Sequence, residues 1–435
     1  MKIKPAKYMR GTIRLPGDKS ISHRAAMLAS IANGETRIDN FATSEDCSST
    51  VSCLRSLGVL IDRDGNTVVV NGVGKTGFTP PSAPLDCGNS GTTMRLLAGI
   101  MAGQNFRSVL VGDESLQKRP MKRVIEPLSK MGAGIDSNEG RAPLAISGKQ
   151  PLTAIEYRPP VASAQIKSCV LLAGLNSDGE TSVIEPVRTR DHTERMLRWF
   201  GVDVKIDHLA NGSRIAVSGN ATLTARDLVV PSDISSAAFF LIAAVCIDGS
   251  DVTLPNVGFN ASRAAIFDVL RDLEADVQLI DQREVNNEPV ATLRARGHIS
   301  ATQNTEPNLV NGDRIANLID EIPILAVFGT QIDGGIEIRD AAELRVKESD
   351  RISAIVENLR RMGAAVEEFP DGFKVERSKL KGAVIDSFGD HRIAMAFAVA
   401  GLLATGETEI IGAESADISF PGFFETLQSV IVNNE

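Results

Sequence analysis

The pattern of apolar and polar positions repeats six times along the chain. In each copy, a run of β-branched and alternating apolar residues follows a turn, and a segment with apolar residues at helical spacing comes next. The runs occupy 34–41, 105–113, 179–186, 249–257, 334–341 and 406–413, so that their starts lie about 70 to 85 residues apart. Such spacing is typical of internal duplication. Chance recurrence in an α/β chain is the alternative, but three of the runs begin with the same Gly-Glu-Thr turn.

The segments after the runs predict helices that end near a glycine or another small residue. They are 53–61, 127–135, 196–204, 269–277 and 358–366, and the start of a further strand follows each of them. A unit of about seventy residues buries too little apolar surface to be stable alone, so the copies must pack together. The 435 residues therefore predict an α/β protein with two domains of three copies each.

Composition and charge exclude several classes of protein. The longest apolar run, 393–404, is shorter than the roughly 18–20 residues that span a bilayer, and no apolar segment follows the basic N-terminus as in a secretory signal. We therefore expect a cytoplasmic protein with no membrane partner. The net charge of −9 argues against nucleic acid as a partner. The five cysteines show no metal-ligand spacing, so we expect reduced thiols and no metal.

Cations and hydroxyl groups gather where helices are expected to begin. The segments are GDKSISHR (17–24), DCGNSGTTMR (86–95), QKRPMKR (117–123), SAQIKS (163–168), TRDHTE (189–194), LRVKESDR (344–351) and DHRIAMAFAVAG (390–401). Singly, each also fits a solvated surface or a tight loop. Ser20 is the expected cap of the first helix, and helix N-termini attract anions. Together these groups predict a cleft for a polyanion that carries phosphate and carboxylate groups.

Two further stretches lead to opposite conclusions. IDEIP (319–323) places two carboxylates in an apolar stretch, which is costly unless they are paired and therefore favours a functional role. GVGKTG (72–77) matches the dinucleotide fingerprint GxGxxG and ends like a phosphate-binding loop. However, the phosphate loop needs a glycine at the position of Val69, and the fingerprint must open a helix, whereas prolines follow here. We expect an ordinary loop.

In this order along the chain, GDKSISHR, NSGTTMR, KRP, SAQIKS, RDHTE, LRVKESDR and DHRIAM resemble the 5-enolpyruvylshikimate-3-phosphate (EPSP) synthase family over essentially the whole sequence. GDKSI, SAQIK and RDHTE resemble its second class, which includes the glyphosate-tolerant bacterial enzymes. NASR (260–263) departs from that class by a serine in place of threonine. ISFP (418–421) lacks the lysine that many first-class members carry before Thr-Phe-Pro, so one cation contact to phosphoenolpyruvate is missing or supplied elsewhere.

The resemblance implies a two-domain inside-out α/β barrel of the enolpyruvyl transferase type. It has six βαβαββ repeats, three per domain, with the helices inside. One domain is expected at 15–228 and the other in two pieces, 1–14 and 229–435. The resemblance also implies that two crossovers act as a hinge, and that the active site lies in a cleft between the domains, which closes on ligands.

The resemblance also implies transfer of the enolpyruvyl group from phosphoenolpyruvate to the 5-hydroxyl of shikimate 3-phosphate, with release of phosphate and no cofactor or metal. Carried over residue by residue, shikimate 3-phosphate is held by Lys19, Ser20, Arg24, Ser163, Ala164, Gln165, Arg190, Asp320 and Lys347. Phosphoenolpyruvate is held by Lys19, Gly91, Arg119, Gln165, Arg351 and Arg392. Asp320 is the expected base for the attacking hydroxyl, and Glu348 with Lys19 is expected to exchange the proton at the methylene carbon.

Two other functions stay open at this point. The sister enolpyruvyl transferase that acts on UDP-N-acetylglucosamine shares the fold, but it usually has a cysteine near the basic cluster, and 112–123 has none. A non-catalytic anion-binding scaffold is the second alternative. We also expect a monomer, and sensitivity to the inhibitor glyphosate, because tolerant members often have alanine where this chain has Gly91.

Overall fold

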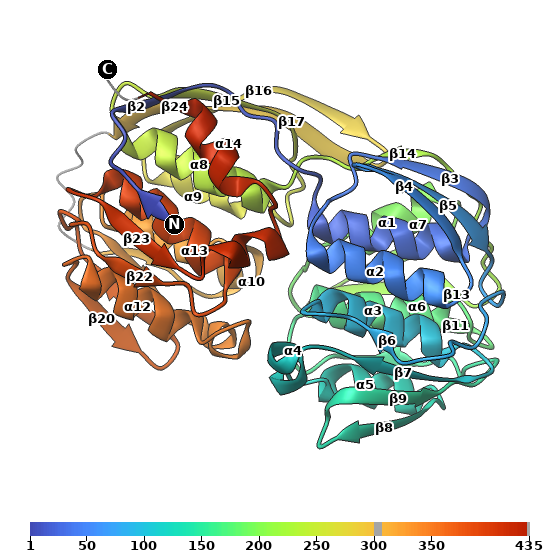
Figure 1. Cartoon of the computed structure of the whole chain (residues 1–435). Helices are drawn as coiled ribbons and strands as arrows, with labels where there is room; N and C mark the ends of the chain where they lie inside the picture. The colour runs from blue at the N-terminus through green and yellow to red at the C-terminus, as the bar shows by residue number, and fades with distance from the viewer. Residues whose placement is uncertain (300–306, 433–435) are drawn as a thin grey trace. The chain divides into compact units, whose positions relative to one another are not determined.

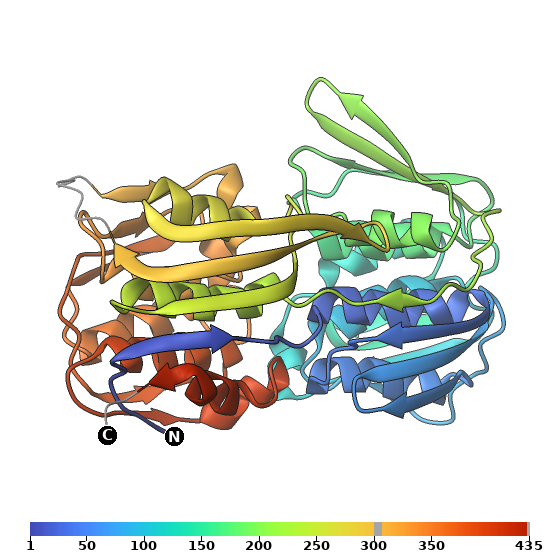
Figure 2. The same cartoon turned by 90° about the horizontal axis from the view of Figure 1, so that it is seen from above.

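The computed structural model describes residues 1–299 and 307–432, and its backbone contacts divide the chain into two compact units. The N-terminal unit is residues 17–230 together with 284–288. The C-terminal unit is residues 1–16, 231–283 and 289–435. In each unit, helices lie inside and sheets lie outside (Figures 1 and 2).

Among the described residues, the strands of the N-terminal unit form three sheets that share one topology. In each sheet the first strand is parallel to the second, and the remaining neighbours are antiparallel. The strand orders are β14 (Leu228–Val229), β3 (Asn33–Asp39), β5 (Thr67–Val73), β4 (Leu60–Asp64); β6 (Leu85–Asp86), β7 (Arg107–Val111), β9 (Arg141–Ser147), β8 (Gly134–Asn138); and β10 (Glu156–Tyr157), β11 (Glu180–Glu185), β13 (Gly212–Ser218), β12 (Lys205–Leu209).

Two kinds of helix fill the N-terminal unit. Three are buried on nearly every side: α1 (Lys19–Ile31), α3 (Gly91–Ala102) and α6 (Ala164–Gly174). Others keep a polar outer face: α2 (Glu45–Ser56), α4 (Glu114–Lys118), α5 (Lys122–Lys130) and α7 (His192–Trp199). Helices α3 and α6 pack closely because Gly99 has no side chain; a Cβ there would lie 2.3 Å from the carbonyl oxygen of Cys169.

The C-terminal unit repeats this plan, with strands from both ends of the chain in its sheets. Strand β1 pairs antiparallel with β23, and β2 pairs parallel with β15. The strand orders are β16 (Ala275–Val285), β17 (Glu288–Ile299), β15 (Asp251–Gly258), β2 (Tyr8–Thr12), β24 (Ile431–Val432); β18 (Asn308–Val310), β19 (Ile336–Ile338), β21 (Gly372–Val375), β20 (Val366–Phe369); and β1 (Lys2–Ile3), β23 (Thr408–Ile411), β22 (Val384–Asp386).

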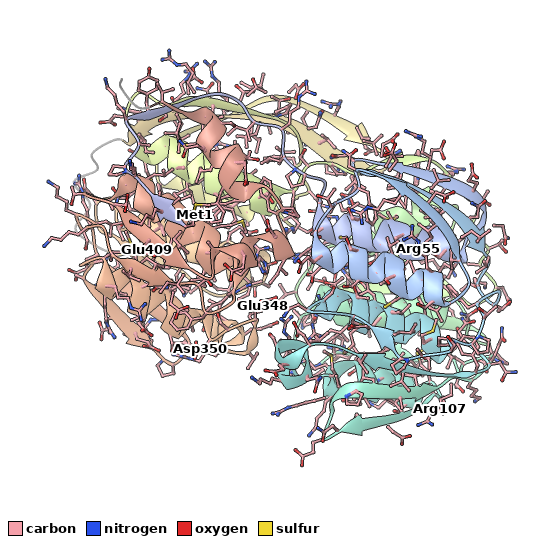
Figure 3. All side chains as sticks on the ribbon, in the orientation of Figure 1. Met1, Arg55, Arg107, Glu348, Asp350 and Glu409 are labelled. Carbon is pink, nitrogen blue, oxygen red and sulfur yellow. The ribbon has the colours of Figure 1, made fainter. Side chains whose placement is uncertain are left out.

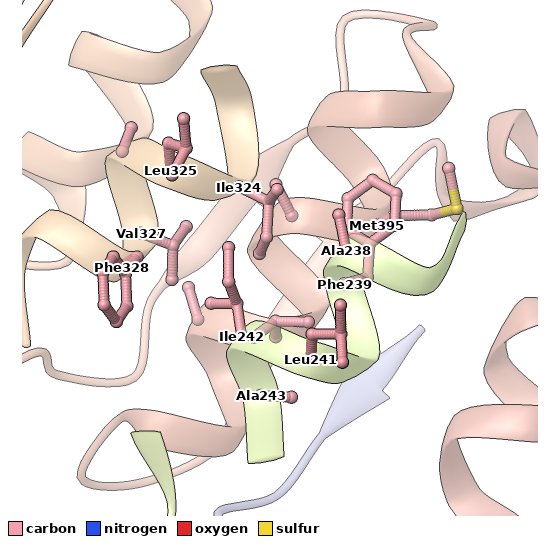
Figure 4. Close-up of a cluster of buried hydrophobic side chains, with 14 of the residues drawn as sticks. Ala238, Phe239, Leu241, Ile242, Ala243, Ile324, Leu325, Val327, Phe328 and Met395 are labelled. Carbon is pink, nitrogen blue, oxygen red and sulfur yellow. The ribbon is translucent and has the colours of Figure 1, made fainter. Parts of the chain in front are cut away.

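Three buried helices form the centre of the C-terminal unit and contact one another: α8 (Ile234–Cys246), α11 (Ile322–Gly329) and α13 (His391–Leu403). Phe239, Ile324 and Met395, one from each helix, belong to the same apolar cluster (Figure 4). The other helices are α9 (Ala265–Asp272), α10 (Asp313–Leu318), α12 (Arg351–Arg361), α14 (Phe423–Val430), η1 (Ala342–Val346) and η2 (Ala413–Ile418). In the described ranges, no helix combines the length and hydropathy needed to cross a membrane.

The strands predicted from the repeat pattern are confirmed, and the predicted helices are confirmed in part. The six runs overlap β3, β7, β11, β15, β19 and β23. The helical segments begin inside α2, α5, α7, α9 and α12 but run past the ends of these helices. Of the expected loop 72–77, residues 72 and 73 end β5 and residues 74–77 form a loop, and no helix begins between β5 and α3. The Lys75 ammonium there donates to the carbonyl oxygens of Leu175 and Gly219, both at 2.7 Å, so it binds the protein's own backbone.

Candidate functional site

The residues predicted from the sequence lie at helix starts in both units. In the N-terminal unit these are Lys19, Ser20 and Arg24 on α1, Gly91 on α3, Ser163, Ala164 and Gln165 at the start of α6, and Arg119 and Arg190 before α5 and α7. In the C-terminal unit they are Asp320 before α11, Lys347 and Glu348 before α12, Arg351 on α12, and Arg392 on α13. We call these two groups, with the residues they contact, the N cluster and the C cluster.

The start of α1 differs from the prediction in one detail. Asp18, not Ser20, caps the helix, because its carboxylate accepts the backbone N–H of Ile21 at 2.8 Å. Ser20 instead lies in the first turn. Lys19 is the first residue of the helix and pairs with Asp46 at the start of α2, at 3.0 Å.

Arg24 is the most buried cation at this end of α1, at 3% exposure. Its guanidinium donates to the hydroxyls of Thr193 (2.7 Å) and Ser168 (3.0 Å) and to the carbonyl of Ser20 (2.8 Å). Burial is the largest cause that lowers the pKa of Arg24, to about 10. All three hydrogen bonds go to neutral oxygens, so Arg24 stays a positive charge that a bound anion can meet.

Arg95 and Arg119 flank Gly91. Arg95 donates to the amide oxygen of Gln165 at 2.7 Å, and Arg119 donates to the amide oxygen of Asn89 at 2.6 Å. A Cβ on Gly91 would lie 2.7 Å from a guanidinium nitrogen of Arg95 and 3.4 Å from one of Arg119. The absence of a side chain at Gly91 therefore leaves room beside two guanidinium groups.

The positive charge of Lys167, unlike that of Arg24, is neutralised by carboxylates. Its ammonium lies 2.7 Å from Glu194 and 3.0 Å from Glu185, and all three side chains are buried. Burial lowers the pKa of Lys167, but the two carboxylates outweigh burial and raise it. The hydroxyl of Thr189 also donates to Glu185, at 2.7 Å. This ion group fixes the segment that carries Arg190 to helix α6.

Arg351 is the centre of the C cluster. It is 1% exposed and lies 2.8 Å from Asp390, 2.7 Å from Glu348 and 3.6 Å from Asp320. Burial lowers the pKa of Arg351, but these carboxylates outweigh burial and raise it. Glu348 lies in the segment that leads into α12 (Figure 3).

Asp320 is approached by three guanidinium groups. Arg263 and Arg351 lie 3.5 and 3.6 Å from its carboxylate, and Arg392 lies 3.8 Å away while donating to the Asp320 carbonyl at 2.8 Å. The Asp320 side chain retains 17% exposure. A carboxylate held by cations and still open to solvent can accept a proton from a ligand. Lys347 pairs with Glu343 at 3.4 Å in the same cluster.

Several residues of the two clusters were not predicted as site residues. They are Asp46, Arg95, Ser168, Thr193, Arg263 and Asp390. Most of them lie in the segments singled out at helix starts, so the motifs contained them although no role followed from the sequence. Among residues 1–299 and 307–432, no group of three or more His, Cys, Asp or Glu side chains could hold a metal ion.

Comparisons with known proteins give one answer. The family model for EPSP synthase (3-phosphoshikimate 1-carboxyvinyltransferase) matches residues 3–427. A 3-phosphoshikimate 1-carboxyvinyltransferase of Citrifermentans bemidjiense is 50% identical over 432 residues, which cover 99% of this chain and 98% of that protein. The enzyme of the same name from Pelotomaculum thermopropionicum is 54% identical over 431 residues, or 98% and 97% of the two chains.

Solved structures agree. A structure of EPSP synthase from Acinetobacter baumannii at 2.37 Å resolution has a TM-score of 0.86 and 41% sequence identity, and the match covers 99% of this chain and 98% of that one. A second structure from the same organism has a TM-score of 0.85 and 40% identity.

Proposed function

Because the chain belongs to the EPSP synthase family and, as a 3-phosphoshikimate 1-carboxyvinyltransferase, transfers the enolpyruvyl group of phosphoenolpyruvate to shikimate 3-phosphate, we propose that the N cluster and the C cluster act on one pair of substrates in this reaction. Its fold is the two-domain enolpyruvyl transferase fold of the EPSP synthases. The observation that carries the proposal is the difference between two buried arginines. Arg24 in the N cluster donates to neutral oxygens, which suits it to binding anions, whereas Arg351 in the C cluster lies among carboxylates that can move protons.

The N cluster supplies most of the contacts to the two anions. Shikimate 3-phosphate is held by Lys19, Ser20, Arg24, Ser163, Ala164, Gln165 and Arg190, and phosphoenolpyruvate by Lys19, Gly91, Arg119 and Gln165. The neutral hydrogen-bond partners of Arg24 support this assignment, because they satisfy the guanidinium without cancelling its charge. Each charge-assisted hydrogen bond to substrate contributes about 1.5–3 kcal/mol.

The C cluster supplies the remaining contacts and the proton transfers. Lys347 and Asp320 hold the hydroxyls of shikimate 3-phosphate, and Arg351 and Arg392 hold phosphoenolpyruvate. Asp320 takes the proton of the 5-hydroxyl as its oxygen adds to C2. Glu348, with Lys19, delivers a proton to C3, which gives a tetrahedral adduct. Loss of that proton and departure of phosphate then form the enolpyruvyl product. Correct placement of the substrates is worth about 7–11 kcal/mol, and proton transfer about 10²–10⁴-fold in rate.

The experiment that tests the proposed function measures phosphate release from phosphoenolpyruvate with and without shikimate 3-phosphate. We expect release only when both are present. Release with UDP-N-acetylglucosamine instead would assign the sister activity. If titration calorimetry shows that both ligands bind but no phosphate is released, the protein is a binding scaffold.

We assign the chain to the second class of the family on the motifs GDKSI, SAQIK and RDHTE, and propose that glyphosate inhibits it. Support comes from Gly91, where an added methyl would press on Arg95 and touch Arg119. Gly91→Ala should therefore weaken glyphosate inhibition more than it raises the KM for phosphoenolpyruvate. An inhibition constant in the unchanged enzyme far above that KM would contradict the proposal.

We also propose that the protein is a monomer and that it lies in the cytoplasm. Sedimentation velocity at micromolar concentration should give a single species near the chain mass of 46.4 kDa. Fractionation of cells that produce the protein should recover it with cytoplasmic markers.

A further inference from the structure

Arg263 is a buried cation whose position points to a role in the reaction. It lies between β15 and α9 and is 2% exposed. One guanidinium nitrogen lies 3.5 Å from the carboxylate of Asp320 and 3.8 Å from that of Glu321. The other lies 2.6 Å from the hydroxyl of Ser235 and 3.4 Å from the carboxylate of Asp233. One side chain therefore bridges α8, where Asp233 is the cap, and the start of α11.

Arg263 occupies a position that is an arginine in three other repeats. In each of these four repeats, the arginine follows β7, β11, β15 or β19 and lies before, or at the first residue of, the half-buried helix α5, α7, α9 or α12. These are Arg119 after β7, Arg190 after β11, Arg263 after β15 and Arg351 after β19. The other three arginines have proposed roles in substrate binding. Arg263 is the one whose described ion pairs all go to carboxylates beside Asp320.

The charges around Asp320 show why a cation is needed on this side. Asp233 and Glu321 are neighbouring carboxylates, and Glu321 is fully buried. Glu321 also accepts a hydrogen bond from the hydroxyl of Ser235. Arg351 and Arg392 face the other oxygen of Asp320, but Arg351 is shared with Asp390 and Glu348. Without Arg263, three carboxylates would lie together, and like charges disfavour ionisation.

We propose that Arg263 is a positioning residue for Asp320: it holds the Asp320 carboxylate in place and in its ionised form against the charges of Glu321 and Asp233. The role rests on the proposed function, in which Asp320 is the base. In this role Arg263 acts through Asp320 and not through a contact of its own with substrate. Its removal is expected to change how turnover depends on pH, and to leave the binding of both substrates nearly unchanged.

The test compares Arg263→Gln with Arg214→Gln across the pH range. Arg214, on β13, also bridges three carboxylates, those of Glu156, Glu180 and Asp207, but belongs to neither cluster. For Arg263→Gln, the acid limb of kcat should move to higher pH by about one unit, which lowers kcat about tenfold on that limb and restores it at alkaline pH. Both KM values should change by less than about threefold. Loss of a direct contact with substrate would raise KM by about tenfold or more.

A double variant separates this role from folding. Arg263→Gln removes a cation beside the buried carboxylate of Glu321, so the single variant loses stability. Arg263→Gln/Glu321→Gln removes one positive and one negative charge together, and its acid limb should return toward that of the unchanged enzyme. A double variant as displaced in pH as the single one would overturn the proposal. So would a single variant whose kcat loss equals its loss of folded protein at every pH.

Asp320→Asn distinguishes failure of the proposed role of Asp320 from failure of the inference about Arg263. If Asp320→Asn keeps its turnover, the proposed role of Asp320 fails, whatever Arg263 does. If Asp320→Asn loses turnover while Arg263→Gln keeps the kcat profile of the unchanged enzyme, only the inference about Arg263 fails.

Discussion

The N cluster and the C cluster both contain buried arginines, but they satisfy them with opposite kinds of partner. Arg24 in the N cluster donates to hydroxyl and carbonyl oxygens. Arg351 in the C cluster lies against the carboxylates of Asp390, Glu348 and Asp320. A neutral partner leaves the positive charge available to a ligand, whereas a carboxylate cancels it. The N cluster thus uses Arg24 for anion binding, whereas in the C cluster Arg351 is proposed both to hold phosphoenolpyruvate and to control the carboxylates beside it.

The largest expected effect tests the C cluster. Asp320→Ala should lower kcat by about 10²–10⁴-fold, because the base is lost, and change both KM values far less. Steady-state kinetics with each substrate varied measure both quantities. The exposed Asp417→Ala on η2 is the control and should match the unchanged enzyme. Unchanged turnover in Asp320→Ala would remove Asp320 from the mechanism.

Lys167 is a fully buried cation of the N-terminal unit whose charge two carboxylates cancel. Lys167→Met should lower the free energy of unfolding by about 3–5 kcal/mol, because it leaves Glu185 and Glu194 buried without a cation. Urea denaturation measures this loss. Lys205→Met breaks the exposed pair with Glu180, and its denaturation midpoint should stay unchanged. Equal effects in the two variants would show that Lys167 is not held as the structure places it.

Arg119→Ala tests whether the N cluster binds rather than reacts. The KM for phosphoenolpyruvate should rise about 10- to 150-fold, which corresponds to the loss of about 1.5–3 kcal/mol of charge-assisted hydrogen bonding, and kcat should change less. Arg107→Ala on β7, an exposed arginine (Figure 3), is the control and should leave the KM unchanged. A loss confined to kcat would move Arg119 from binding to chemistry.

The smallest effect concerns His23, a neutral group among the cations of α1. Burial, then Lys19 and Arg24, lower the pKa of His23 well below its usual value, and its ring bonds the hydroxyl of Thr50 at 2.7 Å. The unfolded chain therefore binds more protons below about pH 6.5, and stability should fall there by up to about 1.4 kcal/mol per pH unit. Above about pH 6.5 the histidine is neutral in both states, so His23 causes no loss of stability there.

Denaturation at several pH values measures this slope. His23→Gln should flatten it below pH 6.5, whatever its effect on absolute stability. His208→Gln, an exposed histidine on β12, is the control and should keep the slope. A slope unchanged in His23→Gln would show that His23 does not resist protonation in the folded protein.

The periodic pattern of the sequence predicted an α/β chain of six repeats in two domains, because each repeat buries one helix and half-buries another. The inside-out barrel was expected from the family resemblance. The comparisons confirm the fold class and the reaction. The ion pairs could not be predicted from the sequence, because their partners lie far apart in the chain: Arg351 pairs with Asp390, and Lys19 pairs with Asp46. Arg263 lay in a quoted motif, but only its contact with Asp320 gives it a role. The cap of α1 was misplaced by two residues, since Asp18 and Ser20 are both good caps.

The roles of the individual site residues stay predictions. Their placement at helix starts follows from the sequence, since capping residues and short β runs mark those positions. The identity of the atom that each side chain would meet does not follow, because it depends on charges contributed by other repeats.

The pairing of β1 and β2 has a consequence for the order in which the protein is made. Strand β1 pairs with β23, and β2 pairs with β15 and β24, so the first strands synthesised find their last partners only when the final repeat has emerged. The N-terminal unit needs no later strand than β14 to complete its sheets. On the ribosome, where domains fold as their segments appear, this unit has its complete set of strands while residues 1–16 still wait for theirs.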